Sequence, residues 1–258
     1  MPYLLYTLVN FRNKYYIAIF KEFLKSLIAF SDLNAFDLCI ITDNITLSTI
    51  QKLNEISKFP NISYIKVPID KTLNTALFRK FDIFHHPQYM SYDKILFLDC
   101  DIIVQTNVIN IFKAIKPKPN KLYVPEEGTV DGKYWTMNAY LPQDIEYMKK
   151  NNIKSFNSGT FMFVPTEIML EHFIKAKTFG LNYKGSHFVD QSVFNYYFNR
   201  LRIACISKYL TNNIQMFPDI TKYYPDKTLI HFSGIGDYKI KRIRMKKYLE
   251  FIKKIKMD

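Results

Sequence analysis

Glycine is scarce in this sequence, with only 7 glycines in 258 residues. No Gly-x-Gly-x-x-Gly follows the first predicted strand, and no Gly-x-x-x-x-Gly-Lys-[Ser/Thr] occurs anywhere in the chain. The glycines of these motifs let a backbone approach a phosphate group closely. Their absence excludes both a dinucleotide fingerprint and a P-loop.

Cysteine is also scarce, and Cys39, Cys100 and Cys205 lie far apart. They form no Cys-x-x-Cys pair and no Cys/His cluster, which argues against a disulfide scaffold and a zinc site. A reducing, intracellular setting is therefore expected. No apolar run approaches the roughly 18 residues that span a bilayer. Residues 1–9 lack a basic leader and a small-residue cleavage site, so a first strand is expected there and no signal peptide.

Acidic residues are outnumbered by basic ones, and the net charge is +13. Such an excess suggests an anionic partner, which could be nucleic acid, a membrane surface or a phosphorylated small molecule. The usage also includes 22 Phe and 19 Tyr together with many Lys, Asn and Ile, as in proteins from AT-rich genomes. Such a composition increases the number of lysines throughout a protein, and we attribute most of the net positive charge to it.

The first half of the chain alternates strand and helix patterns. Repeated β-α units of this length predict a parallel sheet with helices on both faces, so the fold class is α/β. A chain of 258 residues can bury one sizeable core, and a single domain over residues 1–258 is expected. The predicted strands are residues 3–9, 37–42, 62–67 and 94–98, and the predicted helices are residues 15–30, 47–58 and 73–84.

The second half loses this regular alternation. Residues 126–152 are polar and are predicted to form an inserted lid or acceptor-side segment. Residues 239–256 are predicted to form a basic helix with Ile243, Leu249, Ile252 and Ile255 on its apolar side. The other predicted elements are strands at 122–124 and 160–164, a short strand that runs into a loop over 229–234, a helix at 167–179, and a helix from Asp190 to about residue 198.

Asp99 and Asp101 stand in the middle of an otherwise apolar run, residues 94–104, whose flanks 95–98 and 102–104 are predicted to form a buried strand and its continuation. Successive side chains on a strand alternate faces, so these two carboxylates are expected to point the same way. Like charges at the edge of a core are tolerated when a cation lies between them or when one carboxylate is protonated. Oxygen ligands suit Mg²⁺ or Mn²⁺ better than zinc. The alternative is a turn in which both aspartates satisfy backbone amides, but the apolar frame favours a metal site.

Four short motifs follow one another along the chain. They are Asp99-Cys100-Asp101, Asn157-Ser158-Gly159, Asp190-Gln191 and His231-Phe232-Ser233-Gly234. Each alone is weak, but their order on this β-α background is specific and resembles the family-8 retaining glycosyltransferases. That group contains glycogenin and the bacterial lipopolysaccharide glucosyl- and galactosyltransferases. The resemblance extends from Tyr3 to about Lys239.

The resemblance implies a single-domain nucleotide-diphospho-sugar transferase of the GT-A, Rossmann-like type with a mostly parallel central sheet. Residues 1–105 would form the nucleotide-binding units that end in the Asp-x-Asp, residues 106–238 the sugar and acceptor half, and residues 239–258 the basic C-terminal helix. The donor would be a UDP-sugar held through Mn²⁺, with Mg²⁺ as the alternative. Asp99, Asp101 and His231 match the family's metal ligands.

The resemblance also assigns donor-binding residues. The family's pattern His-x-x-Gly-x-x-Lys-Pro-Trp is altered here, because the lysine comes two residues late, at Lys239, and the Pro-Trp is missing. Tyr15 and Tyr16 both lie near the position of the uracil-stacking tyrosine. Asp190 and Gln191 match residues beneath the anomeric carbon. The substrate-binding residues implied are Thr7, Leu8, Val9, Tyr15, Lys80, Asp99, Cys100, Asn157, Ser158, Gly159, Gly234 and Lys239.

The predicted activity is transfer of a hexose, with glucose the family's commonest, from a UDP-sugar with retention at the anomeric carbon. Asp190 could serve as a nucleophile. In the alternative, which we favour, the acceptor attacks on the face from which UDP departs, and Asp190 and Gln191 only position the sugar. The acceptor could be a glycan, a protein or a lipid-linked molecule, and the prediction is compatible with a homodimer.

Two other functions compete with this prediction. A sugar-1-phosphate nucleotidyltransferase would need a glycine-rich phosphate loop after the first strand, and none is present. A nucleic-acid-binding protein would fit the charge, but no helix-turn-helix, zinc finger or aromatic RNA-binding motif accompanies the basic residues, so no nucleic-acid partner is expected. The basic helix at 239–256 could contact a membrane peripherally. A solvated helix that packs on the rest of the protein is the preferred interpretation.

Overall fold

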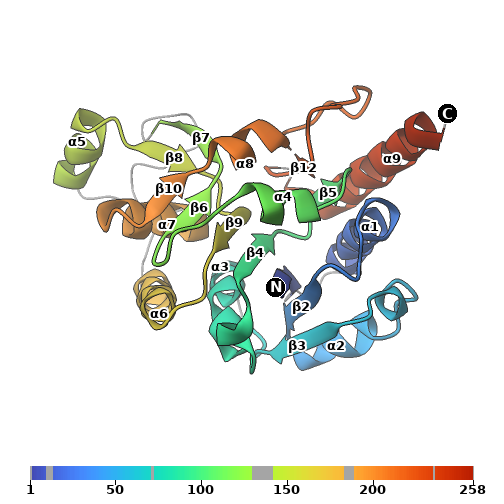
Figure 1. Cartoon of the computed structure of the whole chain (residues 1–258), viewed down its shortest axis with the longest axis horizontal. Coiled ribbons are helices and arrows are strands. Elements are labelled where there is room, and N and C mark those ends of the chain that lie inside the picture. Colours follow the sequence, from blue (N-terminus) through green and yellow to red (C-terminus); the bar gives the residue numbers. More distant parts are fainter. Residues whose placement is uncertain are drawn as a thin grey trace.

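The structure is a computed structural model that describes residues 2–9, 14–70, 73–129, 142–182, 189–234 and 236–257. Its centre is a seven-stranded sheet with the strand order β10-β6-β9-β4-β1-β2-β3 (Figure 1). Strands β1 to β4 run parallel, and β9 is antiparallel to both of its neighbours. The predicted mostly parallel sheet is confirmed. The strands are β1 (Tyr3–Val9), β2 (Asp37–Thr42), β3 (Ile62–Lys66), β4 (Lys94–Leu98), β6 (Leu122–Val124), β9 (Thr160–Phe163) and β10 (Ala204–Ile206).

Two smaller sheets lie beside the central one. The first consists of β11 (Ile214–Met216), β12 (Leu229–His231) and β5 (Ile102–Val104), with β12 antiparallel to β5. The second pairs β7 (Glu126–Thr129) with β8 (Lys154–Phe156). The sequence predicted residues 102–104 as a continuation of β4, and this is wrong. A turn, in which the amide of Ile102 donates to the carbonyl of Asp99 over 3.3 Å, sends β5 into a different sheet.

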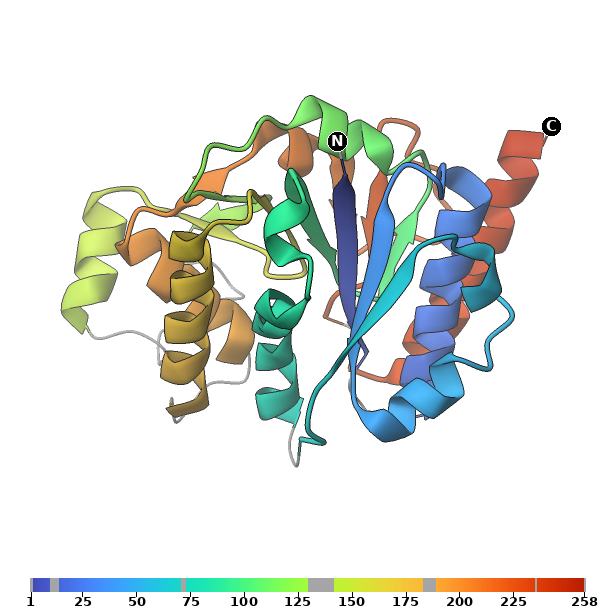
Figure 2. The same ribbon diagram turned by 60° about the horizontal axis from the view of Figure 1, so that its bottom comes forward.

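The helices cover both faces of the central sheet (Figure 2). Helices α1 and α9 lie side by side over one face, and the predicted basic C-terminal helix is confirmed as α9. Among the described residues, no helix combines the length and the apolar character needed to cross a membrane. The helices are α1 (Lys14–Phe30), α2 (Asn44–Ile50), α3 (Leu73–Leu77), α4 (Ile109–Ala114), α5 (Pro142–Lys150), α6 (Glu167–Asn182), α7 (Val189–Arg200), α8 (Lys208–Asn213) and α9 (Tyr238–Met257).

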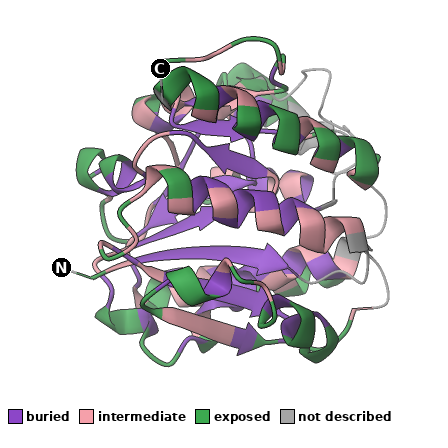
Figure 3. Cartoon of the chain, turned by 90° about the vertical axis from the view of Figure 1, so that its right-hand side faces the viewer, coloured by how far each residue is buried: buried purple, intermediate pink, exposed green. Residues whose placement is uncertain are grey.

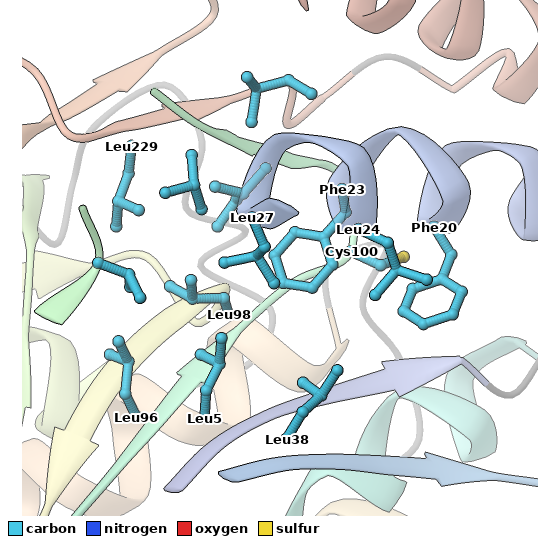
Figure 4. Packing of buried hydrophobic residues seen from close by; sticks show 14 of the residues in the cluster. Leu5, Phe20, Phe23, Leu24, Leu27, Leu38, Leu96, Leu98, Cys100 and Leu229 are labelled. Atoms are coloured by element: carbon cyan, nitrogen blue, oxygen red, sulfur yellow. The ribbon is translucent and has the colours of Figure 1, made fainter. Parts of the chain in front are cut away.

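Alternation along the strands divides the core into two layers. Leu5 and Leu96 pack with Phe23 of α1 on one face of the sheet (Figure 4). Tyr6 and Phe97, the next residues of the same strands, belong to the cluster on the other face. Because side chains alternate across a strand, each central strand is buried on both faces. The helices accordingly have a buried side towards the sheet and an exposed side towards solvent (Figure 3).

Two predicted helices are divided in the structure. The predicted helix 47–58 consists of α2, which begins earlier, and a separate 3₁₀ turn at Ile56–Lys58. Helix α2 begins at Asn44 because the carboxylate of Asp43 accepts hydrogen bonds from the amides of Ile45 and Thr46, both 2.9 Å long. The predicted helix 73–84 consists of α3 followed by a 3₁₀ helix, Phe78–His85. The apolar spacing of i and i+3 fits both helix types, so it does not distinguish them.

Helix α9 buries a different set of side chains from the one predicted. Ile243 is 42 % exposed and Ile255 is 38 % exposed, so their assignment to the apolar side is wrong. Leu249 and Ile252 are buried as expected, and Met245 and Tyr248 complete the buried side.

The predicted lid is described only in part. Residues 130–141 lie outside the described residues, and on either side of them the chain forms β7, α5 and β8.

Candidate active site

A cavity of about 420 Å³ opens where the ends of several strands meet. Its walls come from the turn after β4, the segment before β9, the end of β12 and the first turn of α7. Parallel sheets of this kind bind ligands at the carboxyl ends of their strands. The lining residues are Leu77, Asp99, Asp101, Glu127, Asn157, Ser158, Gly159, Asp190, Gln191, Phe217, His231, Ser233 and Gly234.

Asp99, Asp101 and His231 converge at the floor of this cavity. One ligand atom from each residue lies within 4.8 Å of the others. The two aspartates were predicted to lie on a strand, and this is wrong. They lie in the turn between β4 and β5. The amide of Asp99 donates to the carbonyl of Gly159 over 2.8 Å, and the amide of Phe232 donates to the carbonyl of Asp101 over 3.1 Å. The turn is thereby tied to both neighbouring segments.

Gly159 makes room for this group. A Cβ atom at this position would lie 2.5 Å from Oδ2 of Asp99 and 2.6 Å from Cε1 of His231. Any side chain would therefore push apart two of the three candidate ligands.

Asp101 lies between a histidine and a lysine. Its carboxylate lies 3.1 Å from Nε2 of His231 and 2.5 Å from Nζ of Lys241. Burial favours the neutral acid, but Lys241 and His231 outweigh burial and lower the pKa of Asp101. For Asp99 burial prevails and raises the pKa, although Lys80 acts in the opposite direction. The site thus presents one firmly ionised carboxylate beside a second that is harder to ionise.

The donor atoms fit a divalent cation. In the described part of the structure, Nδ1 of His231 is buried and makes no hydrogen bond. A buried polar atom without a partner is uncommon and calls for an explanation such as a bound ion. Two carboxylates and one imidazole match Mn²⁺, and Mg²⁺ is the alternative.

Lys80 connects the metal triad to the opposite wall. Its side chain is only 1 % exposed, and its Nζ lies 3.0 Å from Oδ2 of Asp190, 3.2 Å from the carbonyl of Ser158 and 3.9 Å from Oδ1 of Asp99. Burial lowers the pKa of Lys80, but Asp99 and Asp190 more than compensate and raise it. The amine is therefore a fixed positive charge between two carboxylates.

The opposite wall is a hydrogen-bonded group of polar side chains. The hydroxyl of Ser158 donates to Asp190 over 3.0 Å. The carboxamide of Gln191 donates to Glu127 over 2.8 Å and accepts from Asn157 over 3.4 Å. Burial raises the pKa of Glu127. Sequence reasoning placed Glu127 only within the polar segment 126–152, and it missed the contact because Gln191 lies in a distant element.

The remaining predicted residues lie outside the cavity, apart from Gly234. Gly234 lines it with a φ of +71°, a conformation that glycine adopts at little cost. Lys239 is exposed, and the lysine of α9 that reaches the aspartates is Lys241, two residues further on. Thr7, Leu8 and Val9 are buried at the end of β1, Tyr15 is partly buried in α1, and Cys100 is buried between the two aspartates.

Comparisons with known proteins agree on one family. Residues 8–239 match the model of glycosyl transferase family 8. Glycogenin from Komagataella phaffii is 26 % identical over 174 residues, which is 60 % of this chain and 36 % of that protein. The chain thus spans about a third of the length of this relative.

Solved glycosyltransferases share the fold at low identity. The bifunctional glycosyltransferase WbbM, in its apo structure, has a TM-score of 0.60 and 15 % identity, over 98 % of this chain and 51 % of that one. GlyE from Streptococcus pneumoniae has a TM-score of 0.59 and 13 % identity, over 96 % of this chain and 61 % of that one. A glycosyltransferase involved in glycosylation of the major capsid of PBCV-1 has a TM-score of 0.56 and 14 % identity, over 94 % of this chain and 98 % of that one.

Proposed function

The chain belongs to glycosyltransferase family 8, and on that premise we propose that it transfers a hexose, in the first instance glucose, from a UDP-sugar to an acceptor with retention at the anomeric carbon. One observation carries the proposal. Asp99, Asp101 and His231 converge on one point of a cavity that Asp190 and Ser158 also line, and both of these are hydrogen-bonded to the buried Lys80. This arrangement supports a divalent metal bound beside a polar wall that would hold a sugar.

Asp99, Asp101 and His231 would hold the metal. When bound, a divalent ion supplies positive charge that stabilises the diphosphate leaving group. Lys80 adds a buried positive charge 3.9 Å from Asp99, and its contacts with Asp190 and Ser158 connect the metal triad to the polar wall. Asn157, Gln191 and Glu127 would hold the hydroxyl groups of the donor sugar.

The hydrogen bonds of Asp190 support the same-face route over a covalent intermediate. Its Oδ2 accepts hydrogen bonds from both Lys80 and Ser158. Hydrogen bonds from an ammonium and a hydroxyl stabilise the negative charge of the carboxylate and so weaken it as a nucleophile. Asp190 therefore positions the sugar and stabilises the positive charge that develops on it. Acceptor attack would occur on the face from which UDP leaves.

A hydrolysis screen tests the proposal. Purified protein with Mn²⁺ is given UDP-glucose, UDP-galactose and UDP-N-acetylglucosamine, and UDP release is measured. We expect release from one donor, at least tenfold faster than from the others, and loss of release on removal of the metal with EDTA.

Variants connect the screen to the site. Asp101→Asn should abolish both UDP release and Mn²⁺-dependent UDP binding measured by calorimetry. Asp219→Ala removes an exposed carboxylate outside the cavity and is the matched control. Unchanged turnover in Asp101→Asn would remove the metal assignment, and absence of release from every UDP-sugar in the wild-type protein would refute the donor class.

A further inference from the structure

Phe217 forms an aromatic wall at the cavity. It directly follows β11, lines the cavity, and is 43 % exposed. Its φ is +50°, in the left-handed region that a phenylalanine rarely adopts. An aromatic residue that is both partly exposed and backbone-strained must be maintained by its surroundings, and such residues concentrate at functional sites.

The surroundings of Phe217 connect it to the metal triad. Its amide donates to the carbonyl of His231 over 3.2 Å, so the backbone of Phe217 is tied to a candidate metal ligand. A Cβ atom at position 234 would lie 2.7 Å from Cε1 of the ring. The ring thus fills the space that a glycine leaves open, next to the segment that follows His231.

Phe217 differs in character from the rest of the cavity. Asn157 and Ser158 are each 4 % exposed and Asp190 is 9 % exposed, so this part of the polar wall is nearly inaccessible to solvent. Under the proposed function these buried side chains hold the donor sugar. The second substrate must then approach from the exposed side, where Phe217 lies.

We propose that Phe217 is the platform of an acceptor subsite that takes a saccharide, and hence that the acceptor is a glycan. The C–H face of a pyranose ring is apolar and packs flat on an aromatic ring, whereas its hydroxyl edges need polar partners. This inference rests on the proposed function and names its second substrate. A uracil ring is a less suitable occupant, because the uridine is expected near β1, whereas Phe217 directly follows β11, a strand of the separate sheet formed by β11, β12 and β5.

Three variants test the platform. Phe217→Gly removes the ring at a position where glycine relieves the left-handed backbone, so folding is preserved and thermal denaturation verifies this. Phe217→Tyr retains a ring. Phe179→Ala is the matched control, because Phe179 is an aromatic side chain of α6 with 37 % exposure and lies outside the active-site cavity.

The probes are maltose, lactose and the methyl glycosides of glucose and galactose. Two quantities are measured in the presence of Mn²⁺: the ratio of sugar transfer to donor hydrolysis, and saccharide binding in the presence of UDP by saturation-transfer NMR. We expect Phe217→Gly to lower the transfer ratio and the saccharide affinity about tenfold, as for loss of one aromatic stacking contact. Phe217→Tyr and Phe179→Ala should stay within twofold of the wild type.

The outcomes separate this inference from the proposed function. Donor hydrolysis by the wild type without transfer to any probe, or equal transfer by Phe217→Gly, would overturn the saccharide subsite and leave the donor assignment standing. A tenfold loss of UDP affinity in Phe217→Gly with unchanged saccharide binding would assign the ring to the nucleotide instead. If the wild type hydrolyses no UDP-sugar, the proposed function is refuted, and the acceptor subsite that rests on it is refuted as well.

Discussion

The ammonium group of Lys241 lies 2.5 Å from Oδ2 of Asp101, so a cation of the chain itself is paired with one of the proposed metal ligands. Lys241 is 7 % exposed, and its partner is a carboxylate on the floor of the cavity. A metal ion that binds to Asp101 must therefore share or displace this pairing.

Lys241→Met is expected to raise the affinity for Mn²⁺ in the absence of nucleotide by at least about tenfold. Two unit charges about 4 Å apart repel by several kcal/mol at the effective dielectric of a protein surface, and tenfold requires only about 1.4 kcal/mol. The measurement is an Mn²⁺ titration followed by electron paramagnetic resonance. Lys239→Met, an exposed lysine of the same helix, is the control and should leave the affinity unchanged. Equal or weaker Mn²⁺ binding by Lys241→Met would contradict the idea that the two cations compete.

Lys80→Met is expected to lower the free energy of unfolding by about 3–5 kcal/mol, because it leaves the partly buried carboxylates of Asp99 and Asp190 without their shared cation. Adding Asp190→Asn should restore part of this stability but no activity. Urea denaturation measures the first effect and UDP release the second. Lys175→Met breaks only an exposed ion pair with Glu171 and should change stability by less than about 1 kcal/mol. A double variant no more stable than Lys80→Met would show that the two residues are not coupled.

Gly159→Ala is expected to abolish Mn²⁺ binding with a smaller effect on folding. The added methyl group would press on Asp99 and His231, whose atoms lie 2.5 and 2.6 Å from its position. Gly236→Ala is the control, because a Cβ atom there meets nothing within 4 Å. Calorimetric titration with Mn²⁺ and a thermal unfolding curve are recorded for both variants. Wild-type Mn²⁺ affinity in Gly159→Ala would mean that this group does not bind the metal.

The three cysteines are expected to differ in reactivity. Cys39 and Cys100 are buried and Cys205 is partly exposed. A thiol reagent at pH 8 should modify one cysteine in the folded protein and three after unfolding, and Cys205→Ser should remove the fast-reacting one. Modification of two or more thiols in the folded protein would contradict the burial described.

Cys39 should also make stability depend on alkaline pH. Burial raises its pKa from 9.0 to about 12 in the folded protein. Between these values the unfolded chain has lost the proton and the folded chain has kept it, so the free energy of unfolding falls as pH rises. Cys39→Ala should make this decline shallower in urea denaturation series from pH 8.5 to 10.5.

Much of the central sheet could be predicted from the sequence. The strands at residues 3–9, 37–42 and 94–98 have the predicted bounds, because short apolar runs bounded by polar residues are local signals. The predicted helix 47–58 failed because the side chain of Asp43 caps a helix that begins three residues earlier than the apolar stripe suggested. The apolar side of α9 was assigned wrongly at Ile243 and Ile255, since the side that packs depends on the position of α1.

The sequence likewise indicated some residues of the candidate site and missed others. The four motifs and their order pointed to Asp99, Asp101, His231 and Asp190, because each motif is short and contiguous. Lys241 and Glu127 were missed, and the left-handed backbone of Phe217 has no local signature in its residue type. Lys241 lies 140 residues from Asp101 along the chain, and Glu127 lies 64 residues from Gln191.

Local patterns of apolar and polar residues were thus sufficient to predict the α/β class, the parallel core of the sheet and the aspartate pair as candidate metal ligands, whereas His231 was indicated by the family resemblance. Local patterns could not establish which charged side chains contact one another. Asp101 pairs with Lys241 because α9 packs on α1, and His231 faces the aspartates because β12 pairs with β5 in a sheet apart from the central one. Contacts of this kind arise from the packing of elements distant in the chain, and no pattern within a single segment encodes them.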